Sequence, residues 1–138
     1  MWQHLGMTVN VELLIYLIIF FQVKHFIADF VLQNVWMLQK SRPSWDFALP
    51  LAIHSGVHAL ATLTAVLLLA PSLWWLAILD FVVHFVMDRI KAGPRYLGRF
   101  TDVRGKAFWV SFGLDQMVHH LTHLYIAYLI AAAVVVTT

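Results

Sequence analysis

The chain has no cysteine, and among its 7 acidic residues only Glu12 is a glutamate. Without cysteine, disulfides and thiolate metal sites are excluded, so a metal ion would have to be held by imidazole, carboxylate, amide or water ligands. Glu12 lies near the start of an apolar stretch, far from the other acidic groups, which excludes the glutamate base of His-Glu-x-x-His zinc proteases. Charge is scarce as well: 12% of the residues are charged, against about a quarter in a typical soluble domain.

What the chain has instead is apolar surface, since 62% of its residues are hydrophobic and its mean hydropathy is +0.79. Four apolar stretches each approach the ~20 residues that a helix needs to cross a hydrocarbon core. Because only helices and closed barrels satisfy the backbone in lipid, such long runs predict an all-α fold. We therefore expect a single integral membrane domain over 1–138, a four-transmembrane-helix bundle with helices at about 12–36, 47–70, 74–91 and 107–136.

The basic residues predict the orientation of this bundle. Eight of the nine Lys and Arg residues lie in or beside the first and third connections, and none lies in either terminal segment or at the Pro71 turn. The positive-inside rule then places these two connections in the cytoplasm and both termini outside. Tryptophans predict an aromatic belt on each side, with Trp2, Trp74 and Trp75 outside and Trp36, Trp45 and Trp109 inside. The ninth basic residue, Lys24, is expected to snorkel toward an interface.

Ionisable residues inside a membrane span are costly, and they mark function by default. Here they come in pairs spaced i, i+4, so both members of a pair project from one face of a helix. Four such faces predict a cage of metal ligands in the cytoplasmic half of the bundle, as in dinuclear helix bundles. The candidate ligands are His25, Asp29, His54, His58, His84, Asp88, Asp115 and His119, with Asp88 in a position to bridge two ions. Candidate outer-shell or substrate-contacting residues are Gln33, Asp80, Lys91, Gln116 and His123.

Three further histidines are not assigned as metal ligands: two are expected to lie outside the cluster, and one has two possible roles. His120 points about 100° away from His119 on an ideal helix and is expected to be peripheral. His123 lies one turn deeper than His119 and is equally well interpreted as a ligand or as an outer-shell group. His4 is expected to be a solvated terminal residue.

The polar pattern also repeats along the chain. His25-Phe-x-x-Asp29 recurs 59 positions later as His84-Phe-x-x-Asp88, and His54 and His58 are followed 61 positions later by Asp115 and His119. The sequence thus predicts two tandem helical hairpins related by an axis along the membrane normal.

Three segments resemble the signature of an uncharacterised bacterial integral membrane family, domain of unknown function 3307. They are His25-Phe-Ile-Ala-Asp29-Phe-Val-Leu-Gln33, His84-Phe-Val-Met-Asp88-Arg-Ile-Lys91 and Asp115-Gln116-x-x-His119. The resemblance implies a small multi-pass protein of the bacterial inner membrane and brings no activity with it. The His/Asp pattern is also distantly similar to membrane-bound metal-dependent hydrolases.

Together these features favour a metal-dependent hydrolase that acts on a lipid or phosphoester at the cytoplasmic leaflet. Two divalent ions, Zn, Mn or Fe, would suit the oxygen and imidazole donors, and metal-bound water would be the nucleophile. Basic residues that follow the third stretch could hold a phosphate, although ordinary topology and attraction to anionic lipids explain them better. We expect the lipid bilayer as a partner and no nucleic acid, and we leave homo-oligomerisation open.

Three alternatives remain open from sequence. The first is a di-iron or copper redox protein, because His119-His120-x-x-His123 is similar to the histidine boxes of membrane desaturases. The second is a metal transporter, a metal or proton sensor, or a haem-binding protein, although the predicted outer halves of the helices are nearly all apolar. The third involves no metal at all: a buried hydrogen-bond network that joins the helices.

Overall fold

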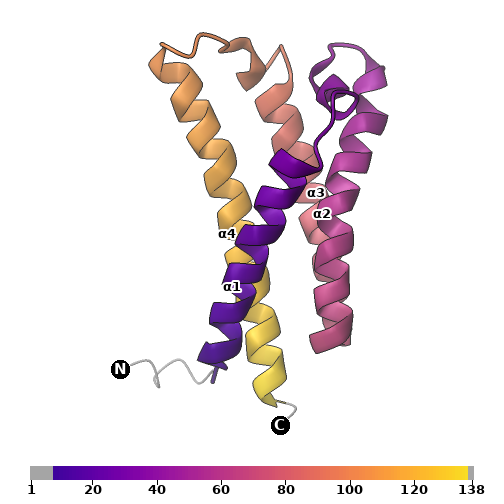
Figure 1. The fold of residues 1–138 in the computed structure, drawn as a ribbon, viewed down its shortest axis with the longest axis vertical. Coiled ribbons are helices and arrows are strands. Elements are labelled where there is room, and N and C mark those ends of the chain that lie inside the picture. The colour runs from indigo at the N-terminus through magenta and orange to yellow at the C-terminus, as the bar shows by residue number, and fades with distance from the viewer. Residues whose placement is uncertain (1–7, 137–138) are drawn as a thin grey trace.

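The computed structural model describes residues 8–136, and this part of the chain is all-helical, without a strand. Four long helices run alongside one another (Figure 1), which confirms the predicted all-α class and the number of helices. They are α1 (Val11–Phe26), α2 (Ala48–Leu69), α3 (Trp75–Ala92) and α4 (Lys106–Val136). The predictions for Trp2 and His4 lie outside the described residues.

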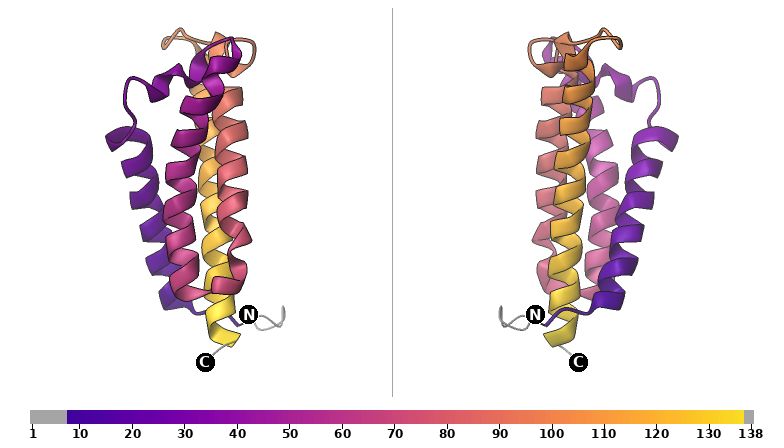
Figure 2. Two further views of the ribbon diagram at one scale, coloured as in Figure 1. Left: turned by 90° about the vertical axis from the view of Figure 1, so that its right-hand side faces the viewer. Right: turned by 90° about the vertical axis from the view of Figure 1, so that its left-hand side faces the viewer.

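The connections divide the bundle into two different ends. The short turn η5 (Pro71–Leu73) lies at the end where α1 begins and α4 finishes (Figures 1 and 2). The opposite end carries η3 (Met37–Ser41), η4 (Trp45–Phe47) and η6 (Leu97–Arg99). We call this the basic end, because the Lys- and Arg-rich connections form it. The two groups of connections thus separate as the charge pattern predicts.

The first helix ends earlier than predicted and in an unusual geometry. After α1 the chain continues as a π-helical turn, η2 (Ile27–Val31), in which the Leu32 amide donates to the Ile27 carbonyl at 2.8 Å. The sequence suggested a helix to about residue 36, but the chain turns away after Val31. The Asn34 side chain gives the reason, since its Oδ1 accepts from the Met37 amide at 3.0 Å and starts the next turn.

Packing is tight at one end of the bundle and more open at the other. α2 lies along α3, while α4 packs against both α1 and α3. α1 contacts α2 much less and leans away from the other helices toward the basic end (Figure 2). An apolar core fills the end opposite the basic end, and its buried members are Leu17, Phe21, Val66, Ala70, Leu76, Ile126, Ala127, Ile130 and Ala131.

The outer surface of the bundle is apolar over most of its length. Large side chains such as Leu68, Ile78 and Tyr125 are exposed. Three segments are long and apolar enough to cross a membrane: Val11–Val31, Trp45–Leu69 and Lys106–Val134. α3 does not meet the same measure, because within 18 residues it carries four charged side chains. These charged residues are Asp80, Asp88, Arg89 and Lys91.

Candidate metal centre

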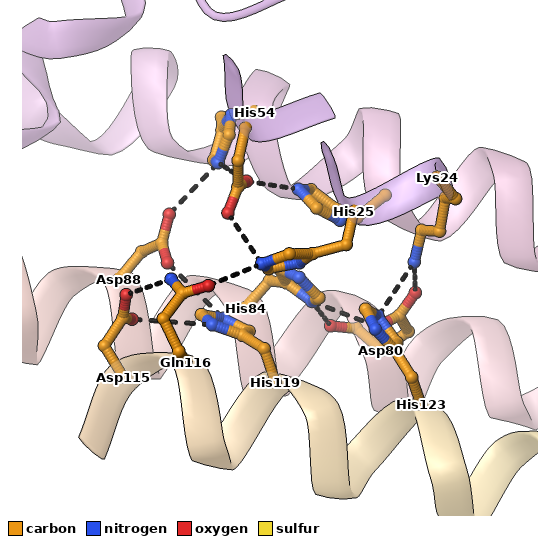
Figure 3. A network of polar contacts seen from close by, with 12 residues as sticks. Lys24, His25, His54, Asp80, His84, Asp88, Asp115, Gln116, His119 and His123 are labelled. Atoms are coloured by element: carbon orange, nitrogen blue, oxygen red, sulfur yellow. Dashed lines mark hydrogen bonds and ion pairs between the residues drawn. The ribbon is translucent and has the colours of Figure 1, made fainter. Parts of the chain in front are cut away.

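The polar faces of the four helices meet in one network inside the bundle (Figure 3). The network reaches the basic end, where Lys40 of the first connection contacts Asp88. Six imidazoles of the network are at most 4% exposed: His25, His54, His58, His84, His119 and His123. Three carboxylates, Asp80, Asp88 and Asp115, are buried among them, and Asp29 is partly buried. Because each helix contributes at least one of these side chains, the i, i+4 faces do form one interior cluster. The eight predicted ligands all belong to it.

Four of the imidazoles form what we call the inner group: His25, His58, His84 and His123. One ring nitrogen of each lies within 4.8 Å of one from each of the others. The rings of His58 and His84 stack with centroids 3.8 Å apart, and those of His84 and His123 lie 5.4 Å apart. Nitrogens around a tetrahedral zinc ion are separated by roughly 3.3 Å, given Zn–N bonds of about 2.05 Å. To bind one ion the four nitrogens would therefore have to move closer together, and the stacked rings of His58 and His84 would have to turn.

Three histidines of the inner group, His84, His58 and His25, each have one nitrogen directed at an acceptor. Nδ1 of His84 lies 3.0 Å from Asp80 Oδ1, and Nε2 of His58 lies 2.8 Å from Asp29 Oδ1. Nε2 of His25 is 3.0 Å from the Gln116 amide oxygen. A proton held on the nitrogen that faces an acceptor leaves the lone pair on the other nitrogen.

The second nitrogens of these rings are buried and make no hydrogen bond within the part of the chain that the structure describes. They are Nε2 of His84 and Nδ1 of His25, His58 and His123. Buried polar atoms without a partner are rare and call for an explanation, such as water or an ion. Metal-bound imidazoles show this arrangement, in which one nitrogen donates to a carboxylate or carbonyl and the other binds the metal.

Lys24 corrects one expectation, because it does not snorkel. It is 6% exposed, and its ammonium donates to Asp80 Oδ2 at 2.5 Å and to Thr62 Oγ1 at 3.1 Å. The ammonium also lies 3.1 Å from Nε2 of His123, which in turn lies 3.3 Å from Asp80 Oδ1. Lys24, Asp80 and His123 thus close the end of the network that lies farther from Asp88 and Asp115 (Figure 3).

The sequence contained a signal for this buried lysine. Asp80 lies one turn deeper than His84 in the third helix, and a carboxylate at that depth requires a cation. Of the nine basic residues, Lys24 alone is far from the connections. Thr62 was also missed, because a threonine in an apolar helix carries no comparable signal.

A second set of ligands, which we call the outer group, consists of Asp88, Asp115 and His119. One candidate ligand atom from each lies within 4.8 Å of those of the other two. His119 sits between the carboxylates, with Nε2 3.4 Å from Asp88 Oδ1 and Nδ1 3.4 Å from Asp115 Oδ1. His54 links this group to Asp29, since its Nε2 lies 3.1 Å from Asp88 Oδ2 and 3.2 Å from Asp29 Oδ1. Asp88 therefore contacts imidazoles from two other helices, as a bridging ligand would.

The outer group opens onto a cavity of about 100 Å³ at the basic end, which we call the mouth. Two basic side chains reach into it and pair with the carboxylates. Lys40 Nζ lies 2.8 Å from Asp88 Oδ2, and Lys91 Nζ lies 3.9 Å from Asp115 Oδ2. The full lining is Asp29, Phe30, Gln33, Lys40, Asp88, Lys91, Ala92, Phe112, Asp115 and Gln116.

Arg89 holds the connection that carries Lys40. Its Nη1 donates to the backbone carbonyls of Lys40 and Arg42 at 3.1 and 2.8 Å, and its guanidinium lies 3.6 Å from the centre of the Phe47 ring. Among the basic residues near the end of α3, only Lys91 lines the mouth. Lys40 was not among the predicted site residues, because nothing in the sequence shows that the first connection folds back over the site.

Two glutamines and one further histidine lie around these groups without belonging to them. Gln33 lines the mouth, and its Oε1 is buried without a hydrogen bond among residues 8–136. The Gln116 amide nitrogen donates to Asp115 Oδ2 at 3.1 Å, while its oxygen faces His25. The ring of His120 lies 5.2 Å from that of His25, yet His120 is only partly buried and belongs to none of the groups that could hold a metal.

Comparisons with known proteins leave the chemistry to be inferred from the site. The model of the family described as protein of unknown function (DUF3307) matches residues 13–138. No curated protein and no solved structure matches the chain. The distant similarity to membrane-bound hydrolases stays a prediction.

Proposed function

Since the chain belongs to the DUF3307 family, whose members are proteins of unknown function, we propose a function from the site itself: it is an integral membrane metalloprotein that hydrolyses an ester or phosphoester at the cytoplasmic leaflet. The proposed nucleophile is water bound to a divalent ion in the His/Asp cluster. The observation that carries this proposal is the inner group, in which every imidazole has one nitrogen near an acceptor and one buried nitrogen without a partner among the described residues.

The proposal places all four helices across the membrane, with the basic end in the cytoplasm. For α3 a position across the membrane needs further support, because this helix carries four charged residues. Asp80 and Asp88 are buried inside the bundle, where they face histidines and lysines instead of lipid. Arg89 and Lys91 lie in its last turn, where they reach the interface. At 18 residues α3 is about 27 Å long, close to the thickness of a hydrocarbon core.

Donor chemistry supports a hard or borderline divalent ion. Imidazole suits Zn and Fe, and carboxylate oxygens also suit Mn. The inner and outer groups would each hold an ion, consistent with a dinuclear centre. A divalent ion held there would lower the pKa of water toward neutrality, so no glutamate base would be required.

Hydrolysis fits the shape of the polar region better than transport does. The mouth opens at the basic end, whereas an apolar core fills the opposite end around Phe21, Val66 and Leu76. A transported ion would have to cross that core without ligands, which is costly. A site that is reached from one side only suits a reaction whose substrate enters and leaves at the same membrane face.

Metal analysis of the purified protein, combined with one pair of variants, tests the proposal. We expect wild type to retain Zn, Mn or Fe through purification in detergent. His84→Ala should lower metal affinity at least tenfold, because it removes a ligand and leaves Asp80 without one of its imidazoles. His120→Ala is the matched control, since it removes an imidazole from outside the metal groups and should leave the metal content unchanged.

Two results would contradict the metal site. One is wild-type protein that inserts into membranes but binds no divalent ion at micromolar concentration. The other is a His84→Ala variant whose metal affinity equals that of wild type and of the His120→Ala control.

A further inference from the structure

The charge balance of the mouth depends on two lysines, because three carboxylates line it and the third, Asp29, faces His54 and His58 instead of a lysine. Lys40 pairs with Asp88 and Lys91 pairs with Asp115, so two ammonium groups cancel two carboxylates. The side chains of Lys40, Asp88 and Asp115 are at most 15% exposed, so water screens these charges only partly. Lys91 is more accessible, at 38%.

A divalent ion in the outer group would disturb this balance, because it would use the same carboxylates. With Asp88, Asp115 and His119 turned to the metal, Lys40 and Lys91 would lose their partners while still lining the cavity. The ion and the two lysines would then outweigh the three carboxylates that line the mouth, Asp29, Asp88 and Asp115, so the mouth would be net positive in a partly buried place. A surplus of this kind is unfavourable unless an anion neutralises it.

From this we infer that the metal-loaded mouth is a binding site for a phosphate group, with Lys40 and Lys91 as its ligands beside the metal. The inference rests on the proposed function and narrows its substrate to phosphoesters. A phosphate monoester carries close to two negative charges at neutral pH, so it would neutralise this positive charge. Tetrahedral oxygens contacted by ammonium groups and a divalent ion are the arrangement that stabilises phosphoryl transfer.

The size and the other walls of the mouth agree with a phosphate group. A cavity of about 100 Å³ has room for a few water molecules, and so for one phosphate but not for a lipid chain. The amides of Gln33 and Gln116 add hydrogen-bonding groups, and the Gln33 oxygen makes no hydrogen bond among the described residues. Phe30 and Phe112 form apolar walls. The rest of the substrate would therefore extend out of the mouth at the level of the lipid headgroups.

Phosphorus NMR of the protein in lipid nanodiscs tests this site, with inorganic phosphate as the probe and Mn²⁺ as the bound metal. Protein-bound Mn²⁺ speeds the relaxation of a phosphorus nucleus that binds next to it. We expect saturable enhancement with the metal-loaded wild type and none with the metal-free protein. Nanodiscs that contain phosphatidic acid show whether a lipid phosphate competes with the free one, which separates a lipid substrate from a soluble one.

Lys91→Gln and Lys40→Gln make the test specific, because each variant should weaken the binding of phosphate and strengthen the binding of the metal. Each should weaken phosphate binding about tenfold, since it removes a charge-assisted hydrogen bond. Each should also strengthen Mn²⁺ binding, since it removes an ammonium group that competes with the metal for a carboxylate. A variant that was merely misfolded would weaken both. Lys106→Gln, at an exposed position at the start of α4, should change neither.

The failures of the two proposals are distinguishable. Protein that binds no Mn²⁺ or Zn²⁺ would overturn the metal site itself. Protein that binds Mn²⁺ but gives no saturable phosphate effect would overturn the phosphate site and leave the metal site standing. Equal phosphate affinity in wild type and both lysine variants would overturn the role of Lys40 and Lys91.

Discussion

At the scale of single residues, Lys24 is the side chain on which the deep end of the site depends. Its ammonium fixes Asp80, and Asp80 in turn faces His84 and His123. The Nε2 atom of His123 lies near both charged groups, and Nδ1 is free for a metal only when Nε2 donates its proton to Asp80. Lys24 is therefore a positioning residue, acting through Asp80 on two candidate ligands.

Two variants separate the contribution of Lys24 to stability from its contribution to metal affinity. Lys24→Met leaves the Asp80 carboxylate buried without its ammonium partner, which should lower stability by about 3–5 kcal/mol. Lys24→Met combined with Asp80→Asn removes both charges and should recover most of that stability, as measured by SDS-induced unfolding. Metal affinity should stay 10–100-fold below wild type in the double variant, because an amide orients and polarises imidazole less well than a carboxylate. Wild-type metal affinity in the double variant would contradict the positioning role.

The residues of the site differ in how far sequence could predict them. The imidazoles and carboxylates were predictable, because an i, i+4 spacing fixes the face of a helix and a helix that is otherwise apolar is expected to turn its one polar face toward the other helices. Lys24 was misjudged, because a long flexible side chain is compatible with either an interface or a buried partner. Lys40 lies outside the long helices, so its pairing with Asp88 depends on the path of a connection and follows from no periodicity.

At the scale of elements, sequence predicted the four helices and which connections lie together at each end of the bundle. It did not predict where the first helix ends. Apolar residues continue beyond Val31, at Leu32, Val35 and Trp36, so the apolar pattern could not reveal that Asn34 starts a new turn there. The contacts also bear on the predicted hairpin repeat. Asp29 in the first helical segment meets His58 in the second, and Asp88 in the third meets His119 in the fourth. The repeat itself stays a prediction.

The absence of cysteine makes the placement of the connections directly measurable. Single cysteines can be introduced into an otherwise unreactive chain, at Ser72 in η5 and at Ser41 in η3, both of which are exposed. If the basic end is cytoplasmic, a membrane-impermeant maleimide should label Ser72→Cys in intact cells. It should label Ser41→Cys only after the membrane is opened. The reverse pattern would invert the predicted topology and move the site to the other leaflet.

At the scale of the whole molecule, polarity is divided along the bundle axis. One half is an apolar core, and the other holds the His/Asp cluster and opens at the mouth. A sequence can predict this division, because the depths of polar residues can be counted from the helix ends. It cannot show which nitrogens and oxygens face one another, since that depends on helix rotation and on the splay of α1.

The central claim is that imidazoles from all four helices hold a divalent ion, and X-ray absorption at the edge of the bound metal tests it most directly. For the zinc-loaded protein in lipid, we expect a first shell of about four nitrogen or oxygen atoms at about 2.0–2.1 Å. Several histidines should add the outer-shell scattering of imidazole rings, and His84→Ala should reduce it. An oxygen-only shell without imidazole scattering, or no stoichiometric zinc at all, would contradict the account.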